Sequence, residues 1–272
     1  MKRRAFFQTS FAASLPFSFM GNSQLQTTES PKTYVLVPGT WHGGWVWQAV
    51  KNILQAKGHR VYTPTPTGVG ERSHLLTPEV DLYTHITDIV NVIKWEELEE
   101  VILVGYSFSG ITITGVADAM KDKIKHIVFY DALVPRAGTM KAWPSKNSPL
   151  YESYEKRRAN YIDGYKMDFF QDYTLDMLIN EGYPEIRAKL KKLLTYHPLG
   201  QWTTPLVLEN GGYDNLPKTY IRCAGQKYRP SSDWMPGPAK NNPDWNWIEL
   251  PVSRSGMLTH PELVAECFLN IE

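Results

Sequence analysis

The chain has 272 residues, of which 42% are hydrophobic and 21% charged, a balance typical of a soluble globular protein and not of a disordered one. This length is enough to bury one large core, so a single α/β domain is the default organisation. The formal net charge is +1 and no basic cluster lies beyond the N-terminus, which argues against nucleic acid as a partner.

The first residues form a separate segment. Residues 3–7 put paired arginines before two phenylalanines, and a mildly apolar run continues to about Gly21. This pattern is typical of a twin-arginine export signal, with an ordinary amphipathic N-terminus as the alternative. The run is too short and too polar to span a membrane. We therefore expect residues 1–31 to be an export signal and flexible leader, and the protein to be exported, most simply to a bacterial periplasm.

From residue 32 onwards, short apolar segments alternate with amphipathic ones. Strands are predicted over residues 33–39, 59–64, 101–104, 124–131, 218–224 and 245–250, the first of them ending at a turn. Helices are predicted over residues 47–58, 82–95, 111–120 and 261–268, with a turn-rich loop over residues 65–77. Strands that alternate with helices of this length indicate a mostly parallel sheet with crossover helices.

The most informative stretch is residues 101–110. Four aliphatic residues predict a strand buried on both faces, a sharp turn centred on Ser107 follows, and then a packed helix. This order is that of a nucleophile elbow, in which small residues must flank the serine because two backbone segments come close together. Gly105 meets that demand before Ser107, and Ser109 with Gly110 follows it. The alternative is a Gly-Tyr-Ser loop between ordinary elements.

The alternation of strands and helices stops between about residues 135 and 213. This stretch is rich in tyrosine, lysine and proline, includes a helical pattern over residues 185–194, and is too long to be one loop. We predict a helical cap inserted over the carboxyl edge of the sheet, where α/β folds place their ligands. Its many aromatic side chains most simply form the cap's own core, with an apolar or sugar-like ligand site as the alternative.

Several stretches beyond the elbow carry a resemblance to a known family. Residues 41–45 read WHGGW, residues 68–81 read GVGERSHLLTPEVD, residues 130–135 read YDALVP, and residues 257–259 read MLT. With these stretches the chain resembles the α/β-hydrolase superfamily. More narrowly, it is similar to the small-ester esterases that include plant methyl-ester hydrolases, hydroxynitrile lyases and bacterial relatives. The resemblance covers almost everything after residue 32 and implies one α/β-hydrolase domain over residues 32–272.

The resemblance also implies which residues form the site. Ser107 would be the nucleophile, and the backbone N–H groups of Thr40 and Phe108 would form the oxyanion hole. In relatives the acid lies in a Cys-Thr-x-Asp type sequence, which here reads CAGQ and puts Gln226 at the acid position. The base lies in a Gly-His-x-x-Met-Leu type sequence, which here reads SRSGML and puts Arg254 at the histidine position. Arginine does not accept a proton at ordinary pH, so Ser107 lacks its usual activation.

Four interpretations follow from these substitutions. In the first, the protein remains a hydrolase with a relocated triad, drawing on the pocket candidates His42, His74, Asp131 and His260. A partnership of His74 with Asp131 is one form of it, although structural or substrate-contact roles are simpler for both. His260 precedes a proline at a helix start, where a surface histidine is the simpler interpretation.

In the second interpretation, Arg254 holds a carboxylate, sulfate or enolate beside Ser107 in a lyase or isomerase step, unless it turns outward or pairs with Glu249. The third is a ligand-binding protein that keeps the pocket without the chemistry, and the fourth is a purely structural partner, which nothing in the sequence favours. Family membership favours hydrolysis of a small carboxylic ester through Ser107.

The sequence implies a small-molecule substrate or ligand and no metal or organic cofactor, because it has no dinucleotide fingerprint and no metal-ligand spacing. Cys223 and Cys267 form no disulfide framework and no zinc pattern, and a bond between them is not predicted. The oligomeric state does not follow from the sequence.

Overall fold

The computed structural model describes residues 30–135, 140, 143–229 and 235–272, and Pro31–Glu272 form one compact unit. The predicted export signal, apart from residues 30 and 31, lies outside the described residues. Residues 230–234, 136–139 and 141–142 also lie outside them.

A six-stranded sheet runs through this unit in the order β2-β1-β3-β4-β7-β8, with every neighbouring pair parallel. The strands are β1 (Thr33–Val37), β2 (Arg60–Tyr62), β3 (Val101–Tyr106), β4 (Ile124–Tyr130), β7 (Lys218–Cys223) and β8 (Asn246–Leu250). All residues of β1 and β3 are buried, as expected for central strands of a parallel sheet. The strand order reverses between β1 and β3, so the carboxyl ends of these two strands form the crevice where such sheets bind ligands.

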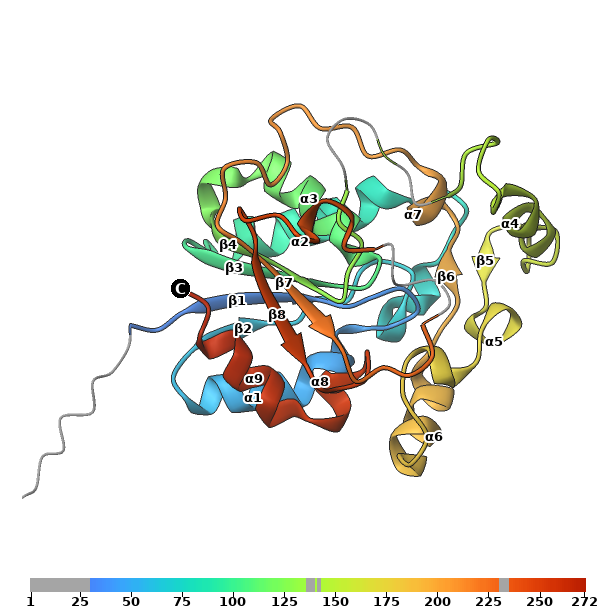
Figure 1. Cartoon of the computed structure of the whole chain (residues 1–272). Coiled ribbons are helices and arrows are strands. Elements are labelled where there is room, and N and C mark those ends of the chain that lie inside the picture. The colour runs from blue at the N-terminus through green and yellow to red at the C-terminus, as the bar shows by residue number, and fades with distance from the viewer. Residues whose placement is uncertain (1–29, 136–139, 141–142, 230–234) are drawn as a thin grey trace, which may run out of the picture. The chain divides into compact units, whose positions relative to one another are not determined.

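Helices cover both faces of the sheet (Figure 1). Helices α1 (Gln48–Ala56) and α9 (Pro261–Leu269) pack together on one face, and α2 (Leu82–Trp95) and α3 (Ser109–Ala119) on the other. Alternate residues of β1 divide between the two faces: Tyr34 belongs to the core under α1 and α9, and Val35 to the core under α2 and α3. Asp81 caps the N-terminus of α2, because its carboxylate accepts a hydrogen bond from the Thr84 backbone N–H.

The predicted cap is present between β4 and β7 and lies at the right of Figure 1. It contains α4 (Tyr151–Arg158), β5 (Lys166–Met167), α5 (Phe169–Asp172), α6 (Pro184–Leu193), β6 (His197–Pro198) and α7 (Gly200–Thr203). The helix expected over residues 185–194 is α6. The antiparallel pair of β5 and β6 was not expected, because strands of two residues leave no periodic pattern. Further short elements are α8 (Gly256–Thr259) and the 3₁₀ turns at Gly44–Trp47, Gly70–Leu75, Lys121–Lys123, Leu175–Met177 and Gly237–Ala239.

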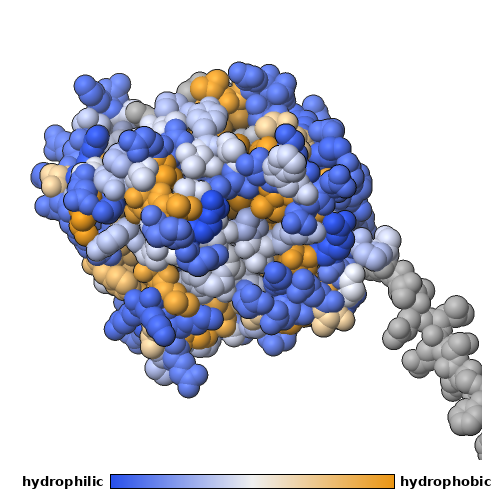
Figure 2. Space-filling model, turned by 180° about the vertical axis from the view of Figure 1, so that it is seen from behind, coloured by the Kyte–Doolittle hydropathy of each residue, from blue (hydrophilic) through white to orange (hydrophobic). Residues whose placement is uncertain are grey.

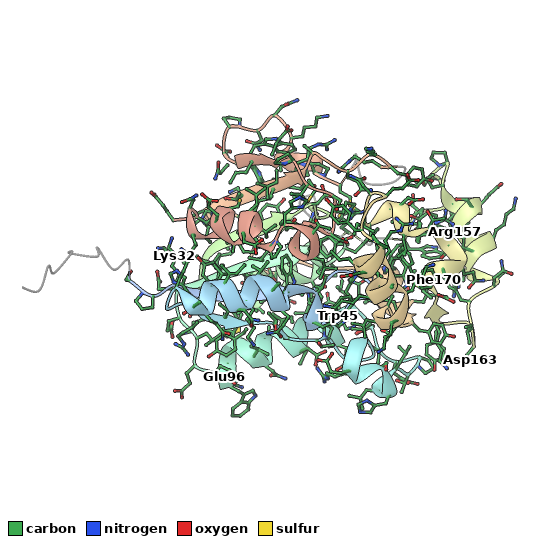
Figure 3. All side chains as sticks on the ribbon, turned by 90° about the horizontal axis from the view of Figure 1, so that it is seen from below. Lys32, Trp45, Glu96, Arg157, Asp163 and Phe170 are labelled. Atoms are coloured by element: carbon green, nitrogen blue, oxygen red, sulfur yellow. The ribbon has the colours of Figure 1, made fainter. Side chains whose placement is uncertain are left out.

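Most large aromatic side chains of the cap belong to its core, as the simpler interpretation predicted. The buried ones join the apolar cluster that also holds α2 and α3; they are Trp143, Tyr154, Tyr161, Phe169 and Trp202. Phe170 and Tyr196 are exposed, and Figure 3 shows Phe170 and Arg157 on the cap, at the far end of the unit from Lys32. The face in Figure 2 is mainly hydrophilic, with apolar residues in separate small patches.

Candidate active site

Ser107 lies in the turn between β3 and α3, as the elbow pattern predicted. Its φ is +57°, in the left-handed region that residues with a Cβ rarely occupy. The turn is held by three backbone hydrogen bonds: the Ser107 N–H donates to the Tyr130 carbonyl (3.3 Å), and the Ser107 carbonyl accepts from Leu133 (2.8 Å) and Gly110 (3.3 Å). Because neighbouring backbone fixes both sides of Ser107, the strained conformation persists and presents the hydroxyl at the end of β3.

The closest backbone approach in the elbow is at Gly110. A Cβ there would overlap the Leu133 carbonyl oxygen, whereas Ser109 has room for a side chain, whose hydroxyl donates to the Pro38 carbonyl. On the other side of the serine, a Cβ on Gly39 would lie 3.0 Å from the Ser107 Cβ. The elbow therefore accepts serine at position 109 because its requirement for glycine falls one residue later.

The two predicted oxyanion donors lie at the carboxyl ends of β1 and β3. Thr40 and Phe108 are both buried, and neither backbone N–H donates to any described residue. Phe108 also caps the N-terminus of α3, where the helix dipole favours negative charge. These two N–H groups are available to an oxygen that gains charge beside Ser107.

The cap holds Trp41, the residue that follows Thr40. Trp41 has φ +67°, and its backbone N–H donates to His197 Nδ1 (3.2 Å). Its indole N–H donates to the Met167 carbonyl (3.0 Å), and its own carbonyl accepts from the Thr195 N–H (3.2 Å). Sequence reasoning missed His197, because a histidine inside the cap belongs to no motif. Burial lowers the pKa of His197 well below its ordinary value, so the ring is neutral and Nδ1 accepts.

Arg254 points inward, toward the serine. Its side chain is 1% exposed, Nη2 donates to Ser107 Oγ (2.8 Å), and Nε lies 2.9 Å from Asp131 Oδ2, an ion pair without the alignment of a hydrogen bond. The alternatives that Arg254 turns outward or pairs with Glu249 are wrong. Glu249 accepts instead from the indole N–H of Trp247. The guanidinium also lies 5.9 Å from the centre of the Tyr106 ring, whose pKa burial raises to about 12.

Asp131 lies directly after β4 and is fully buried beside the guanidinium. Its φ is +41°, and its Oδ1 accepts from the Cys223 N–H (3.3 Å) and from Arg229 Nη2 (2.9 Å). A buried carboxylate needs such partners, because burial without them would be costly. Asp131 thus lies between two guanidiniums, and one of these contacts Ser107 Oγ.

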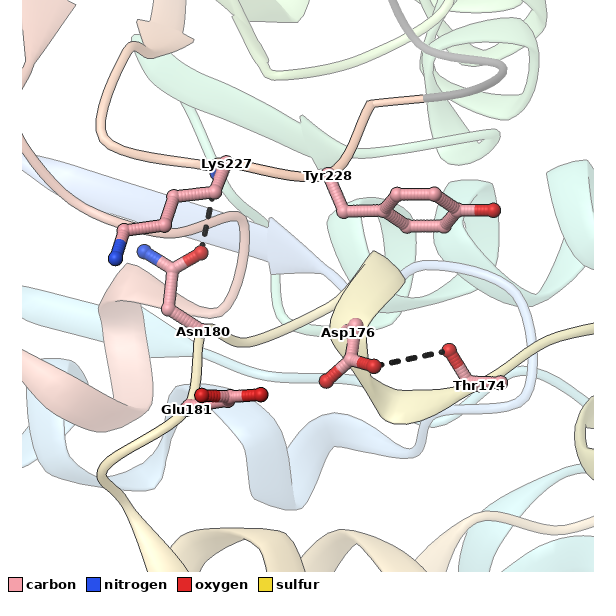
Figure 4. A pocket seen from close by; sticks show the side chains of 6 residues that line it. All are labelled: Thr174, Asp176, Asn180, Glu181, Lys227 and Tyr228. Carbon is pink, nitrogen blue, oxygen red and sulfur yellow. Dashed lines mark hydrogen bonds between the residues drawn. The ribbon is translucent and has the colours of Figure 1, made fainter.

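Among the described residues, the side chain of Gln226, at the predicted acid position, forms hydrogen bonds only with backbone groups. Its Oε1 accepts from the Arg254 N–H (3.0 Å), and its Nε2 donates to the carbonyls of Asp176 (2.5 Å) and Tyr228 (3.2 Å). Asp176 and Tyr228 also line a cavity of about 330 Å³ between the cap and the loop after β7 (Figure 4). Gln226 therefore ties the cap and this loop to the segment that carries Arg254.

The structure does not place the histidine candidates at Ser107. The His42 Nδ1–H donates to the Thr40 carbonyl (2.8 Å), and burial together with the positive charge of Arg254 lowers the His42 pKa to about 4. His74 is exposed and lines a separate cavity, and His260 lies at the start of α9 with Nδ1 on the Thr259 hydroxyl. Within residues 30–135, 140, 143–229 and 235–272, no histidine hydrogen-bonds Ser107 Oγ or Asp131.

Among the described residues, no group of His, Cys, Asp and Glu side chains could hold a metal ion. The same part of the chain has no helix that is long and apolar enough to cross a membrane. Cys223 and Cys267 are both buried and unpaired.

A parallel sheet with a serine elbow and a cap defines a hydrolase-type fold, and comparisons identify the family. The model of the alpha/beta hydrolase family matches residues 34–267. The chain is 34% identical over 246 residues to a carbendazim hydrolyzing esterase of Nocardioides sp. (strain SG-4G), covering 86% of this chain and 96% of that protein. It is 34% identical over 273 residues to methylesterase 1 of Arabidopsis thaliana, covering 88% and 95%.

A solved structure gives the same result. An extracellular alpha/beta-hydrolase from a Paenibacillus species, described as sharing structural and functional homology with tobacco salicylic acid binding protein 2, matches with a TM-score of 0.74. Its sequence is 25% identical, and the match covers 88% of this chain and 98% of that one. The chain therefore belongs to the alpha/beta hydrolase family, and its relatives include esterases.

Proposed function

We propose that the protein is an esterase that acts on a small carboxylic ester through Ser107. The observation that carries the proposal is the contact of Arg254 Nη2 with Ser107 Oγ at 2.8 Å, inside an elbow whose two oxyanion donors have no other described acceptor. The esterase relatives support the same reaction class. A carbonyl carbon above Ser107 would leave its oxygen near the N–H groups of Thr40 and Phe108.

Arg254 assists this reaction differently from a histidine. A guanidinium stabilises the anionic form of Ser107 Oγ by a charge-assisted hydrogen bond, but it accepts no proton. The proton therefore passes to a hydroxide ion from solvent, which becomes water. The Ser107 Oγ then bonds to the carbonyl carbon, and collapse of the tetrahedral intermediate expels the alkoxide, which takes a proton from water. A second hydroxide attacks the acyl group, and the tetrahedral intermediate expels the Ser107 oxygen as an alkoxide and leaves a carboxylic acid. The acid gives its proton to the Ser107 oxygen and departs as the carboxylate.

The absence of a described proton acceptor at Ser107 sets the expected rate. General acid–base catalysis contributes roughly 10²–10⁴-fold in enzymes, so turnover near neutral pH should be slower than in esterases with a histidine base by about that factor. Because hydroxide takes the proton, the rate should rise with pH instead of levelling off near the pKa of an imidazole.

Binding without turnover is the second candidate function, and one observation favours it. Arg254 Nη1 has no acceptor among the described residues, and a carboxylate is the ligand that a guanidinium and two backbone N–H groups suit best. The occupant would then be a small carboxylic acid, the product class of the proposed esterase. Its binding would be lost in Arg254→Met.

A fluorophosphonate probe and a panel of short-chain aryl esters test the proposal. We expect slow labelling and slow turnover that both disappear in Ser107→Ala and persist in Ser109→Ala, the matched control two residues away. Ester turnover that survives Ser107→Ala would contradict the proposed role of Ser107. Neither labelling nor turnover, together with saturable binding of short carboxylic acids, would instead favour the binding function.

We also propose that the paired arginines at residues 3 and 4 direct export of the folded protein, which the sequence pattern supports. Replacing both with lysine should leave the protein in the cytoplasm of a bacterium that carries the twin-arginine pathway. Equal amounts of both forms in the periplasm would contradict this proposal.

A further inference from the structure

We propose that Asp131, at the end of β4, is the carboxylate that positions residue 254 against Ser107, in place of the acid expected after β7. This inference rests on the proposed site at Ser107. It gives Asp131 the task of orienting the side chain of residue 254, which Gln226 does not contact through the guanidinium. It also predicts that one substitution, Arg254→His, completes a serine–histidine–aspartate arrangement in this chain.

The side chains already lie in the order that such an arrangement needs. Asp131 Oδ2 lies 2.9 Å from Arg254 Nε, and Arg254 Nη2 lies 2.8 Å from Ser107 Oγ. Residue 254 therefore contacts the carboxylate through one nitrogen and the serine through a neighbouring one. In serine hydrolases a carboxylate that contacts the base orients it and stabilises its charged form.

Asp131 is held independently of Arg254. Its Oδ1 accepts from the Cys223 N–H (3.3 Å) and from Arg229 Nη2 (2.9 Å), and its own N–H donates to the Ile221 carbonyl (2.7 Å). These contacts come from β7 and the loop that follows it. Replacing Arg254 thus leaves the carboxylate with a cationic partner, so it remains in place.

Gln226 is unsuited to the acid role in this chain. Its Nε2 donates to two backbone carbonyls, of Asp176 and Tyr228, and its Oε1 accepts from the Arg254 backbone and not from the guanidinium. A carboxylate at position 226 would face those two carbonyl oxygens without a proton to donate, which is unfavourable for a buried charge. Gln226→Asp should therefore weaken the loop and leave the serine unchanged.

Arg254→His places an imidazole between Ser107 and Asp131. The imidazole takes the hydroxyl proton while Ser107 Oγ bonds to the carbonyl carbon, and it then gives that proton to the departing alkoxide. In the second half it takes a proton from water, which attacks the acyl group, and it returns that proton to Ser107 Oγ as the carboxylic acid leaves. The acid then loses its remaining proton to solvent. Asp131 takes no part in the proton transfer and stabilises the imidazolium in both halves.

The test measures ester hydrolysis in four proteins that all carry Arg254→His: the single variant and its combinations with Asp131→Asn, Gln226→Asp and Ser107→Ala. We expect the single variant to exceed the unaltered protein by about 10²-fold or more at pH 7, the lower end of what a general base contributes. Asp131→Asn and Ser107→Ala should each remove the gain, and Gln226→Asp should not increase it. A gain that requires Gln226→Asp, or that survives Asp131→Asn, overturns the proposal.

An NMR titration of the introduced imidazole keeps the proposal testable if turnover stays low. A neighbouring carboxylate favours the protonated ring, so Asp131→Asn should lower the pKa of that imidazole by about one unit or more. An unchanged pKa overturns the proposal. This readout does not depend on ester turnover by the unaltered protein, so failure of the esterase proposal and failure of the Asp131 assignment remain distinguishable.

Discussion

The two halves of the Ser107 site differ in the kind of group that builds them. The elbow half, at the ends of β1 and β3, works through backbone: a serine at φ +57°, the N–H groups of Thr40 and Phe108, and close glycine contacts. The side-chain half, after β4, β7 and β8, works through Asp131, Gln226 and Arg254, and the last two stand where the family resemblance leads us to expect an acid and a base. Backbone groups survive changes of residue type, whereas side-chain chemistry changes with a single substitution.

The elbow half should be the most sensitive to added volume. A Cβ at Gly110 overlaps the Leu133 carbonyl oxygen, which is backbone and cannot rotate away. We expect Gly110→Ala to cost about 3 kcal/mol or more in the free energy of unfolding, measured by denaturant titration. Gly182→Ala is the control: its φ is +100° but nothing lies within 4 Å of the added Cβ, so the cost should be about 1 kcal/mol. Equal costs would contradict the close approach at Gly110.

In the side-chain half, the free energy of unfolding should depend strongly on the buried ion pair between Arg254 and Asp131. Arg254→Met removes one partner of a buried ion pair, and because Asp131 keeps Arg229 we expect a loss of about 2–3 kcal/mol in unfolding free energy. Arg187→Met, which removes a partly exposed pair with Asp176, should cost less than about 1 kcal/mol. If the two variants lose the same stability, the Arg254 pair is not buried as described.

Acid should destabilise the region behind the oxyanion donors. The pKa of His42 is lowered from 6.5 to about 4, so unfolding, which frees the ring to bind a proton, becomes easier as pH falls. The stabilisation is complete above pH 6.5 and is lost progressively between pH 6.5 and about 4. The full loss, reached below the folded-state pKa, is about 3 kcal/mol.

Thermal unfolding across this pH range checks the expectation for His42. His42→Asn keeps a donor for the Thr40 carbonyl and has no proton to gain. The loss of stability between pH 6.5 and about 4 should therefore be smaller in this variant by the contribution of His42. A decline of unchanged size in His42→Asn would assign the acid sensitivity to other groups.

The smallest expected effect concerns the link between the cap and the oxyanion donors. His197→Leu removes the acceptor of the Trp41 N–H and should cost about 1–2 kcal/mol. Leucine should also slow fluorophosphonate labelling of Ser107, because the strand end that carries Thr40 is then less well held. His197→Asn, whose side-chain oxygen can accept the same hydrogen bond, should recover most of both losses. Equal labelling in all three proteins would show that the cap does not position Thr40.

The sequence predicted the helices, strands and elbow turn around this site better than the side-chain contacts within it. Hydrophobic periodicity located α2 over Leu82–Trp95 and the elbow around Ser107, because both depend on local patterns. The Asp131–Arg254 pair joins residues 123 positions apart, and no local pattern reports such a contact. The same is true of His197, whose role arises only where the cap meets β1. Family resemblance indicated the positions of Gln226 and Arg254 without showing which partners they take.

The pH dependence of ester hydrolysis by the unaltered protein tests the central claim most directly. With Arg254 as a donor and hydroxide as the proton acceptor, the Ser107-dependent rate should rise about tenfold per pH unit from pH 6 to 9 without a plateau. A rate that levels off above a midpoint near pH 6–7, as a histidine base produces, would contradict the account.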